Sequence, residues 1–235
     1  MVQLNAAARE LTIKVVYYGP GLSGKTTNLQ QIHARLNPEV RGRLLSVETH
    51  DDRTLFFDLL PVFFESEQGL KVKVKLYTVP GQVIHQATRK LVLQNADAVA
   101  FIANSQRDAT PENNAYWANL LANLKANGLD PEEIPVVIQF NKLDLPGART
   151  AEELEAVRQR GSEPVFGAVA VRGEGVMETF HGVLRAAFRA LDTRHGITSR
   201  MGLTEAQFLT GVFRSLDVSG TELERQFAPA PNGAS

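Results

Sequence analysis

Short apolar segments alternate along the chain with longer segments in which apolar residues recur every three or four positions. The short segments predict strands, and they are Leu11–Tyr18, Leu44–Glu48, Val72–Val79, Ala98–Ala103, Val136–Phe140 and Val165–Val169. The periodic segments predict helices over Lys25–Leu36, Gln86–Gln94, Pro111–Asn127, Ala151–Gln159 and Gly175–Asp192. This alternation predicts an α/β fold, with a doubly wound, mostly parallel sheet of six strands between two layers of helices.

Two of the predicted strands differ in how their apolar residues are spaced. Ala98–Ala103 is apolar throughout, which is typical of a parallel strand that is buried on both faces. In Val72–Val79 the first apolar residues alternate with lysines. That alternation predicts a half-exposed strand at an edge of the sheet, with its lysines toward water.

The composition changes after Gly196, where apolar residues recur at helical spacing behind Thr204 and Gln207. Those two residues have the spacing of a capping box, so we expect a short helix over about 203–216. Residues 228–235 are too poor in apolar side chains to pack and are expected to be disordered. The chain is therefore divided into a domain of residues 1–195 and a C-terminal extension of residues 196–235. The extension's helix could pack on the domain itself or bind a partner.

A glycine-rich loop joins the first long strand to the first helix, Gly19-Pro20-Gly21-Leu22-Ser23-Gly24-Lys25-Thr26. It has every fixed position of the phosphate-loop pattern G-x-x-x-x-G-K-[ST], in the strand–loop–helix context that the pattern requires. The glycines allow backbone N–H groups to approach a triphosphate, and the positive end of the next helix faces the phosphates. We expect Lys25 to bind the β- and γ-phosphates, Thr26 to ligate Mg²⁺ and Thr27 to contact the α-phosphate. The alternative is an ordinary glycine-rich turn.

A second motif, Asn141-Lys142-Leu143-Asp144, follows the strand Val136–Phe140 directly. One carboxylate at Asp144 can accept bonds from both the ring N–H and the exocyclic amine of guanine, whereas adenine offers no such pair of donors. Asn141 is expected either to bind the base or to tie this loop to the phosphate loop. The stem of Lys142 can lie along the purine face. Together with the phosphate loop, the motif predicts a site for GTP or GDP.

The composition excludes several other classes of protein. The 235 residues carry 25 Lys and Arg against 26 Asp and Glu, so no bulk positive charge favours nucleic acid. Because there is no cysteine, disulfides, thiolate metal sites, prenylation and palmitoylation are excluded. Val2 is not the glycine that myristoylation needs, and no apolar run approaches the ~18 residues of a membrane span. We expect a cytoplasmic protein with no lipid anchor, no membrane span and no nucleic-acid partner.

Four segments together resemble the MglA branch of bacterial Ras-like GTPases: Gly19–Thr27, Asp52–Asp58, Tyr77–Gln82 and Asn141–Asp144. The resemblance covers about residues 10–195. It implies a switch that binds GTP or GDP with Mg²⁺ and hydrolyses GTP slowly unless a partner stimulates it. It also implies control of cell polarity or motility, a Roadblock-type, MglB-like partner that stimulates hydrolysis, recruitment to a cell pole through partners, and effectors that the sequence does not name.

The resemblance assigns roles to five further residues. Arg53 corresponds to the family's built-in arginine finger, and Thr54 to the first-switch threonine that senses Mg²⁺ and the γ-phosphate. Gly81 binds the γ-phosphate through its N–H, and Gln82 orients the attacking water. Ala170 meets guanine O6 through its backbone N–H. Hydrolysis of GTP needs an in-line water and positive charge at the β–γ bridge, which are the roles of Gln82 and Arg53.

Two departures from the family's pattern, an alternative role for Arg53 and two rival functions stay open. Ras-type proteins have, in place of Thr78, an aspartate that holds a water on Mg²⁺, whereas MglA-like sequences share the threonine. The sequence therefore leaves open which residue supports the metal. The C-terminal extension continues beyond the point at which members of the family usually end. Arg53 could instead form a surface ion pair with Asp51, Asp52 or Asp58. The protein could also be a non-cycling GTP-binding scaffold; Asn141–Asp144 disfavours a third hypothesis, an ATP-dependent phosphotransferase.

Overall fold

The structure is a computed structural model that describes residues 3–5, 8–48, 56–66, 68–81 and 85–213. Its strands are β1 (Gln3–Asn5), β2 (Glu10–Tyr18), β3 (Leu45–Glu48), β4 (Phe56–Glu65), β5 (Lys71–Thr78), β6 (Ala98–Asn104), β7 (Val136–Asn141) and β8 (Val165–Gly167). Its helices are α1 (Lys25–Arg35), α2 (Gln86–Leu93), α3 (Thr110–Ala126), α4 (Ala151–Arg160), α5 (Val176–His195), α6 (Ile197–Met201) and α7 (Glu205–Phe213), with short 3₁₀ turns η2 (Arg107–Ala109) and η3 (Ala170–Arg172).

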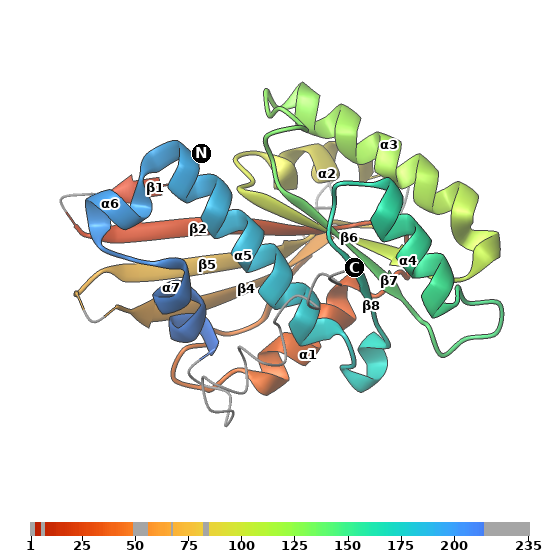
Figure 1. The fold of residues 1–235 in the computed structure, drawn as a ribbon, viewed down its shortest axis with the longest axis horizontal. Coiled ribbons are helices and arrows are strands. Elements are labelled where there is room, and N and C mark those ends of the chain that lie inside the picture. Colours follow the sequence, from red (N-terminus) through yellow and green to blue (C-terminus); the bar gives the residue numbers. More distant parts are fainter. Residues whose placement is uncertain (1–2, 6–7, 49–55, 67, 82–84, 214–235) are drawn as a thin grey trace, which may run out of the picture.

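The strands form one sheet in the order β3-β4-β5-β2-β6-β7-β8, with β1 paired to β2 (Figure 1). Neighbours from β5 through β2, β6 and β7 to β8 are parallel, whereas β3–β4, β4–β5 and β1–β2 are antiparallel. The α/β class and the mostly parallel sheet agree with the sequence-based prediction, as do the five helices expected before residue 196.

Two strands, β1 and β4, were not identified from the sequence, and β4 corrects one prediction. The alternating strand β5 is not at an edge, because β4 pairs with it along Leu59–Glu65. β4 escaped detection because its apolar residues neither alternate regularly nor run without interruption, and Pro61 lies within it. The alternation in β5 is nevertheless real: one of its faces is buried in the core and its lysines lie on the more exposed face.

Helices cover both faces of the sheet and divide the core into two clusters. On one face, Leu11, Ile13 and Val15 of β2 pack with α1, α5 and the C-terminal helix α7. On the other face, Val16 and Tyr18 of the same strand pack with α2, α3 and α4. Because β2 is buried on both sides, its sequence is almost continuously apolar toward its end, and it forms the centre of the fold.

The position of β2 in the strand order decides where a ligand can bind. β2 pairs with β5 on one side and with β6 on the other. After β2 the chain builds β3, β4 and β5 on one side of it, and after β5 it crosses through α2 to build β6, β7 and β8 on the other side. Such a reversal of strand order leaves a crevice at the carboxyl ends of the parallel strands. The loop of residues 19–24 lies at that crevice, directly after β2.

The beginning of the extension packs on the domain. Phe208 of α7 lies 5.1 Å from Phe188 of α5 and 6.0 Å from Phe64 of β4, measured between ring centres. The predicted capping box forms, since the Gln207 N–H donates to Thr204 Oγ1 at 3.2 Å and the Thr204 N–H donates to Gln207 Oε1 at 3.0 Å. Residues 196–213 therefore share one core with the chain before them. The last residues of the expected helix, and residues 228–235, lie outside the described part of the chain.

Candidate nucleotide-binding site

The loop after β2 approaches two neighbouring segments too closely for side chains. A Cβ at Gly19, whose φ is 142°, would lie 2.2 Å from the Ile102 carbonyl oxygen of β6. A Cβ at Gly24, whose φ is 103°, would lie 2.1 Å from Asn141 Nδ2. Leu22 has a φ of 57° and its side chain is 90% exposed. The glycines thus form a cradle whose backbone is open to a ligand, as the phosphate-loop motif requires.

Lys25 is the charged group at the centre of this cradle. Its side chain is buried, and Nζ donates to the carbonyl oxygens of Gly19, at 2.9 Å, and Pro20. Burial, helped by the nearby Arg89 and opposed by the attraction of Glu112 and Asp58, lowers the pKa of Lys25 to about 7. An ammonium held by neutral carbonyls in a buried site is stabilised by any anion that enters, and a phosphate is such an anion.

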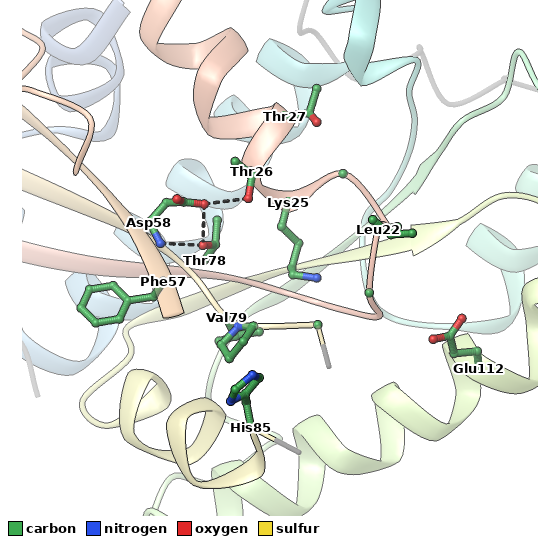
Figure 2. A pocket seen from close by; sticks show the side chains of 14 residues that line it. Leu22, Lys25, Thr26, Thr27, Phe57, Asp58, Thr78, Val79, His85 and Glu112 are labelled. Atoms are coloured by element: carbon green, nitrogen blue, oxygen red, sulfur yellow. Dashed lines mark hydrogen bonds between the residues drawn. The ribbon is translucent and has the colours of Figure 1, made fainter. Parts of the chain in front are cut away.

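A cavity of about 1010 Å³ opens beside Lys25 (Figure 2). Its walls come from the loop and the start of α1, from β4 and β5, from the residues after β5, and from α3. They are lined by Gly21, Leu22, Gly24, Lys25, Thr26, Thr27, Phe57, Asp58, Thr78, Val79, Pro80, Gly81, His85 and Glu112. The volume is at the upper end of the range typical of small-molecule sites. The cavity corresponds to the phosphate end of the predicted site.

A buried carboxylate lies on one wall of this cavity. Asp58 of β4 accepts hydrogen bonds from the hydroxyls of Thr26, at 2.7 Å, Thr78, at 2.9 Å, and Ser46, at 2.7 Å. Figure 2 shows Thr26 and Thr78 pointing toward Asp58 from two different elements. From the sequence, Asp58 was expected only as one possible ion-pair partner of Arg53. The missing aspartate at position 78 was the signal that should have prompted a search for another carboxylate.

The residues predicted to recognise the base gather behind the loop. Asn141 is buried at the end of β7, where its Nδ2 donates to the Ser23 carbonyl at 2.8 Å and its Oδ1 accepts from the Ala170 N–H at 2.8 Å. Of the two roles proposed for Asn141, the structure shows the tie to the phosphate loop. Asp144 Oδ2 lies 3.8 Å from Arg172 Nη2, and Lys142 has a left-handed backbone with a φ of 69°. The Ala170 N–H is directed at Asn141 here, so its contact with guanine stays a prediction.

Gly81 lies against the loop, at the end of β5. A Cβ at Gly81 would be 2.4 Å from Gly21 Cα, and the Gly81 carbonyl accepts a 2.6 Å hydrogen bond from Tyr116 Oη of α3. Tyr116 was not selected from the sequence, because a single tyrosine in an amphipathic helix carries no signal. Three predicted site residues, Arg53, Thr54 and Gln82, lie outside the described residues, so their roles stay predictions.

The protein groups near the cavity suit a small, hard cation on a polyphosphate. Within the described residues, no three His, Asp, Glu or Cys side chains gather as a metal site. What the cavity offers at the start of α1 is the Thr26 hydroxyl with the Asp58 carboxylate beside it, both oxygen donors, and Glu112 adds a second carboxylate to the lining. Mg²⁺ is commonly held in this manner, by few protein oxygens together with substrate phosphates and water. The donor set therefore fits Mg²⁺.

Two curated proteins are similar to this chain over most of its length. Mutual gliding-motility protein MglA of Myxococcus xanthus (strain DK1622) is 45% identical over 188 residues, which cover 80% of this chain and 96% of that protein. ADP-ribosylation factor-like protein 6 of Caenorhabditis briggsae is 25% identical over 187 residues, which cover 77% of this chain and 90% of that protein. No protein-family model matches the chain. Each helix in the described ranges is too short or too polar to cross a bilayer.

Proposed function

The chain belongs to the MglA family of small GTPases, and from that premise we propose that it is a GTP-driven switch that controls cell polarity or motility. As a small GTPase it binds guanine nucleotides and hydrolyses GTP. We further propose that hydrolysis is slow until a partner stimulates it, and that the protein acts in the cytoplasm and is recruited to a cell pole through partners. The single observation that carries the phosphate site is the buried Lys25 ammonium, held by carbonyls beside a large cavity.

In the proposed complex, the loop of residues 19–24 surrounds the phosphates with N–H groups. Lys25 exchanges its carbonyl partners for β- and γ-phosphate oxygens, and Thr27 contacts the α-phosphate. At the other end, Asp144 accepts from guanine and Lys142 covers the purine face. Support comes from Asn141, whose two hydrogen bonds hold the Ser23 and Ala170 segments in one arrangement. These bonds thereby fix the distance between the loop proposed to bind phosphate and the segment proposed to contact guanine.

Mg²⁺ is proposed to be held by the hydroxyls of Thr26 and Thr54. When bound, it neutralises charge on the β- and γ-phosphates. Thr26 lies at the start of α1, where its Oγ1 faces the cavity. Thr54 is part of the segment between β3 and β4, so its contact with the metal would tie that segment to the GTP-bound state.

For hydrolysis, we propose that Gln82 orients the attacking water and that Arg53 places positive charge at the β–γ bridge. Gly81 is proposed to donate its N–H to the γ-phosphate. An MglB-like partner of the Roadblock type would then stimulate hydrolysis by bringing these groups into position. Arginine fingers contribute about 10³–10⁵ to the rate of GTP hydrolysis, so the proposed dependence on Arg53 is large.

The division into a domain of residues 1–195 and an extension of residues 196–235 is also a proposal. Supporting it, α5 ends at Gly196, which has a φ of 62°, and the chain then turns back to place α7 on β4 and α5. The extension is thereby connected to the strand that follows the first switch. We propose that it forms part of the surface that changes between nucleotide states.

A single-turnover measurement of phosphate release tests the proposed function. Wild-type protein loaded with GTP is expected to release phosphate slowly alone and much faster with a Roadblock-type partner. Arg53→Ala and Gln82→Leu should retain GTP but lose the stimulated rate. If GTP is retained without turnover under every condition, the rival hypothesis of a non-cycling scaffold is correct. A competition assay between ATP and GTP tests the third hypothesis. Preference for ATP would favour an ATP-dependent phosphotransferase, and preference for GTP would exclude it.

A further inference from the structure

We infer that Asp58 of β4 supplies the carboxylate that supports Mg²⁺ in this site, in place of the aspartate that Ras-type proteins carry at position 78. The inference deepens the proposed function and rests on its Mg²⁺–nucleotide complex. It assigns a metal-binding role to a residue that comes from a different strand and from a different part of the sequence.

The first observation is the position of Asp58 against the predicted metal ligand. Asp58 Oδ2 lies 2.7 Å from Thr26 Oγ1, across the gap between β4 and the start of α1 (Figure 2). A threonine hydroxyl has one proton to donate and two lone pairs. Because the Thr26 proton is given to Asp58, the lone pairs of Oγ1 are left to bind a cation. Asp58 therefore orients Thr26 as a ligand rather than as a hydrogen-bond donor to phosphate.

The second observation is the unused capacity of the carboxylate. Asp58 accepts three hydrogen bonds, from Thr26, Ser46 and Thr78. Since an ionised carboxylate has roughly four acceptor positions, one is left for a water molecule on the metal. This is the function of the aspartate that Ras-type proteins have at position 78.

The third observation is the charge of the group. Asp58 is only 7% exposed, and its three partners are neutral hydroxyls. In the ranges that the structure describes, no lysine or arginine side chain forms an ion pair with it. Lys25 acts on Asp58 only from beyond ion-pair distance. A buried carboxylate with no cation in contact is unfavourable, and a divalent cation at Thr26 would supply one.

Thr78 explains how a carboxylate on β4 can replace one at position 78 on β5. Thr78 Oγ1 donates to Asp58 Oδ2 at 2.9 Å and accepts from the Asp58 backbone N–H at 2.8 Å, so it holds Asp58 by both its side chain and its backbone. The register of β4 on β5, with Leu59 opposite Tyr77, brings the two residues together. An aspartate at position 78 would bring a second negative charge against Asp58. Thr78 and Asp58 are therefore a matched pair.

The test follows the Mg²⁺ dependence of nucleotide release rather than turnover. A fluorescent GDP is bound to each variant, and its dissociation rate is measured as free Mg²⁺ is titrated from EDTA to millimolar concentrations. Asp58→Asn, which preserves shape, is expected to raise the half-effective Mg²⁺ concentration about 10- to 100-fold, the usual effect of losing a group that supports a metal ligand. Dissociation in EDTA should change less than about twofold, because the carboxylate acts through the metal.

Two further variants complete the test. Thr78→Asp alone is expected to weaken the Mg²⁺ response, whereas Asp58→Asn combined with Thr78→Asp should restore it by returning the carboxylate to β5. Glu65→Gln, at the far and exposed end of β4, is the matched control and should behave as wild type.

Each outcome separates this inference from the proposed function. If wild-type protein shows no Mg²⁺ dependence, the proposed metal complex itself is wrong. If wild type responds and Asp58→Asn keeps the same Mg²⁺ midpoint, or releases GDP faster to the same extent with and without Mg²⁺, the inference is overturned and Asp58 only joins strands. Should Asp58→Asn fail to fold, Thr78→Val keeps the carboxylate but removes its clamp. An unchanged midpoint in that variant would likewise overturn the inference.

Discussion

The base end and the phosphate end of the nucleotide site both bury polar side chains, but they satisfy them differently. At the base end, neutral amides are paired with other neutral groups of the protein. At the phosphate end, a cation and an anion, Lys25 and Asp58, are held by neutral carbonyls and hydroxyls. The amides behind the base end are therefore satisfied within the protein, whereas we expect a ligand to bring the charges that complete the phosphate end.

The amide network behind the base end shows the first pattern. Asn28 of α1 and Gln139 of β7 exchange two hydrogen bonds, of 2.8 and 3.0 Å, and Gln139 Nε2 also donates to Thr179 of α5 at 2.7 Å. All three residues are fully buried. Since every partner is neutral and internal, the network stabilises the fold whether or not nucleotide is bound.

The largest effect is expected from Lys25→Met, which removes the buried cation. Nucleotide affinity should fall at least about 100-fold, because each lost charge-assisted hydrogen bond contributes ~1.5–3 kcal/mol. The ligand-free protein should be as stable as wild type or more so, because a desolvated ammonium is gone. Calorimetric titration and thermal unfolding measure both quantities, with the exposed Lys90→Met as control. Parallel losses of affinity and stability would contradict the contrast between the two ends.

Gln139→Leu should have the opposite profile. It leaves the buried Oδ1 of Asn28 and the hydroxyl of Thr179 without the Gln139 amide, although Asn28 Nδ2 keeps the Gly24 carbonyl, so the free energy of unfolding is expected to fall by about 3 kcal/mol. The folded fraction should still bind GDP within a few-fold of the wild-type affinity. Urea unfolding checks the first expectation, and Gln159→Leu, on the exposed side of α4, serves as the control. A stable variant with greatly weakened binding would place Gln139 in the ligand site instead.

The pH dependence of binding is a smaller effect with a defined sign. In the ligand-free protein, burial lowers the pKa of Lys25 to about 7, with Arg89 also lowering it and Glu112 and Asp58 raising it. Phosphates favour the ammonium, so binding above pH 7 takes up a proton, and affinity should fall by up to tenfold, about 1.4 kcal/mol, per pH unit. The stability of the ligand-free fold should rise over the same range, because the unfolded lysine keeps its proton to about pH 10.5.

Calorimetry at pH 8 in buffers of different protonation enthalpy measures this uptake directly. About one proton should be taken up by wild type. Binding heats that do not depend on the buffer would show that Lys25 is already protonated before the nucleotide arrives.

The smallest effect is expected from Tyr116→Phe, which tests a neutral contact at the phosphate end. Loss of the 2.6 Å hydrogen bond to the Gly81 carbonyl should lower the free energy of unfolding by about 1 kcal/mol. The half-buried Tyr77→Phe is the control and should change it by less than about 0.5 kcal/mol. An affinity loss comparable to that of Lys25→Met would mean that position, rather than charge, limits binding at this end.

Sequence patterns determined the fold class, the main helices and the two motifs that carry the nucleotide site. They could do so because each motif is contiguous: residues 19–27 form one loop and the start of α1, and residues 141–144 run from the last residue of β7 into the next loop. Local backbone geometry places such residues together without reference to the rest of the chain. The same patterns did not identify β4, whose irregular spacing matches neither a strand nor a helix period.

Only the tertiary structure decided how the phosphate end is built. Asp58 meets Thr78 and Thr26 because β4 pairs with β5 in one register, and Tyr116 reaches Gly81 because α3 crosses that face of the sheet. These contacts join residues that lie 20 to 35 positions apart. A shift of one residue in the strand register would turn Asp58 to the other face of the sheet, so its partners depend on packing rather than on local sequence.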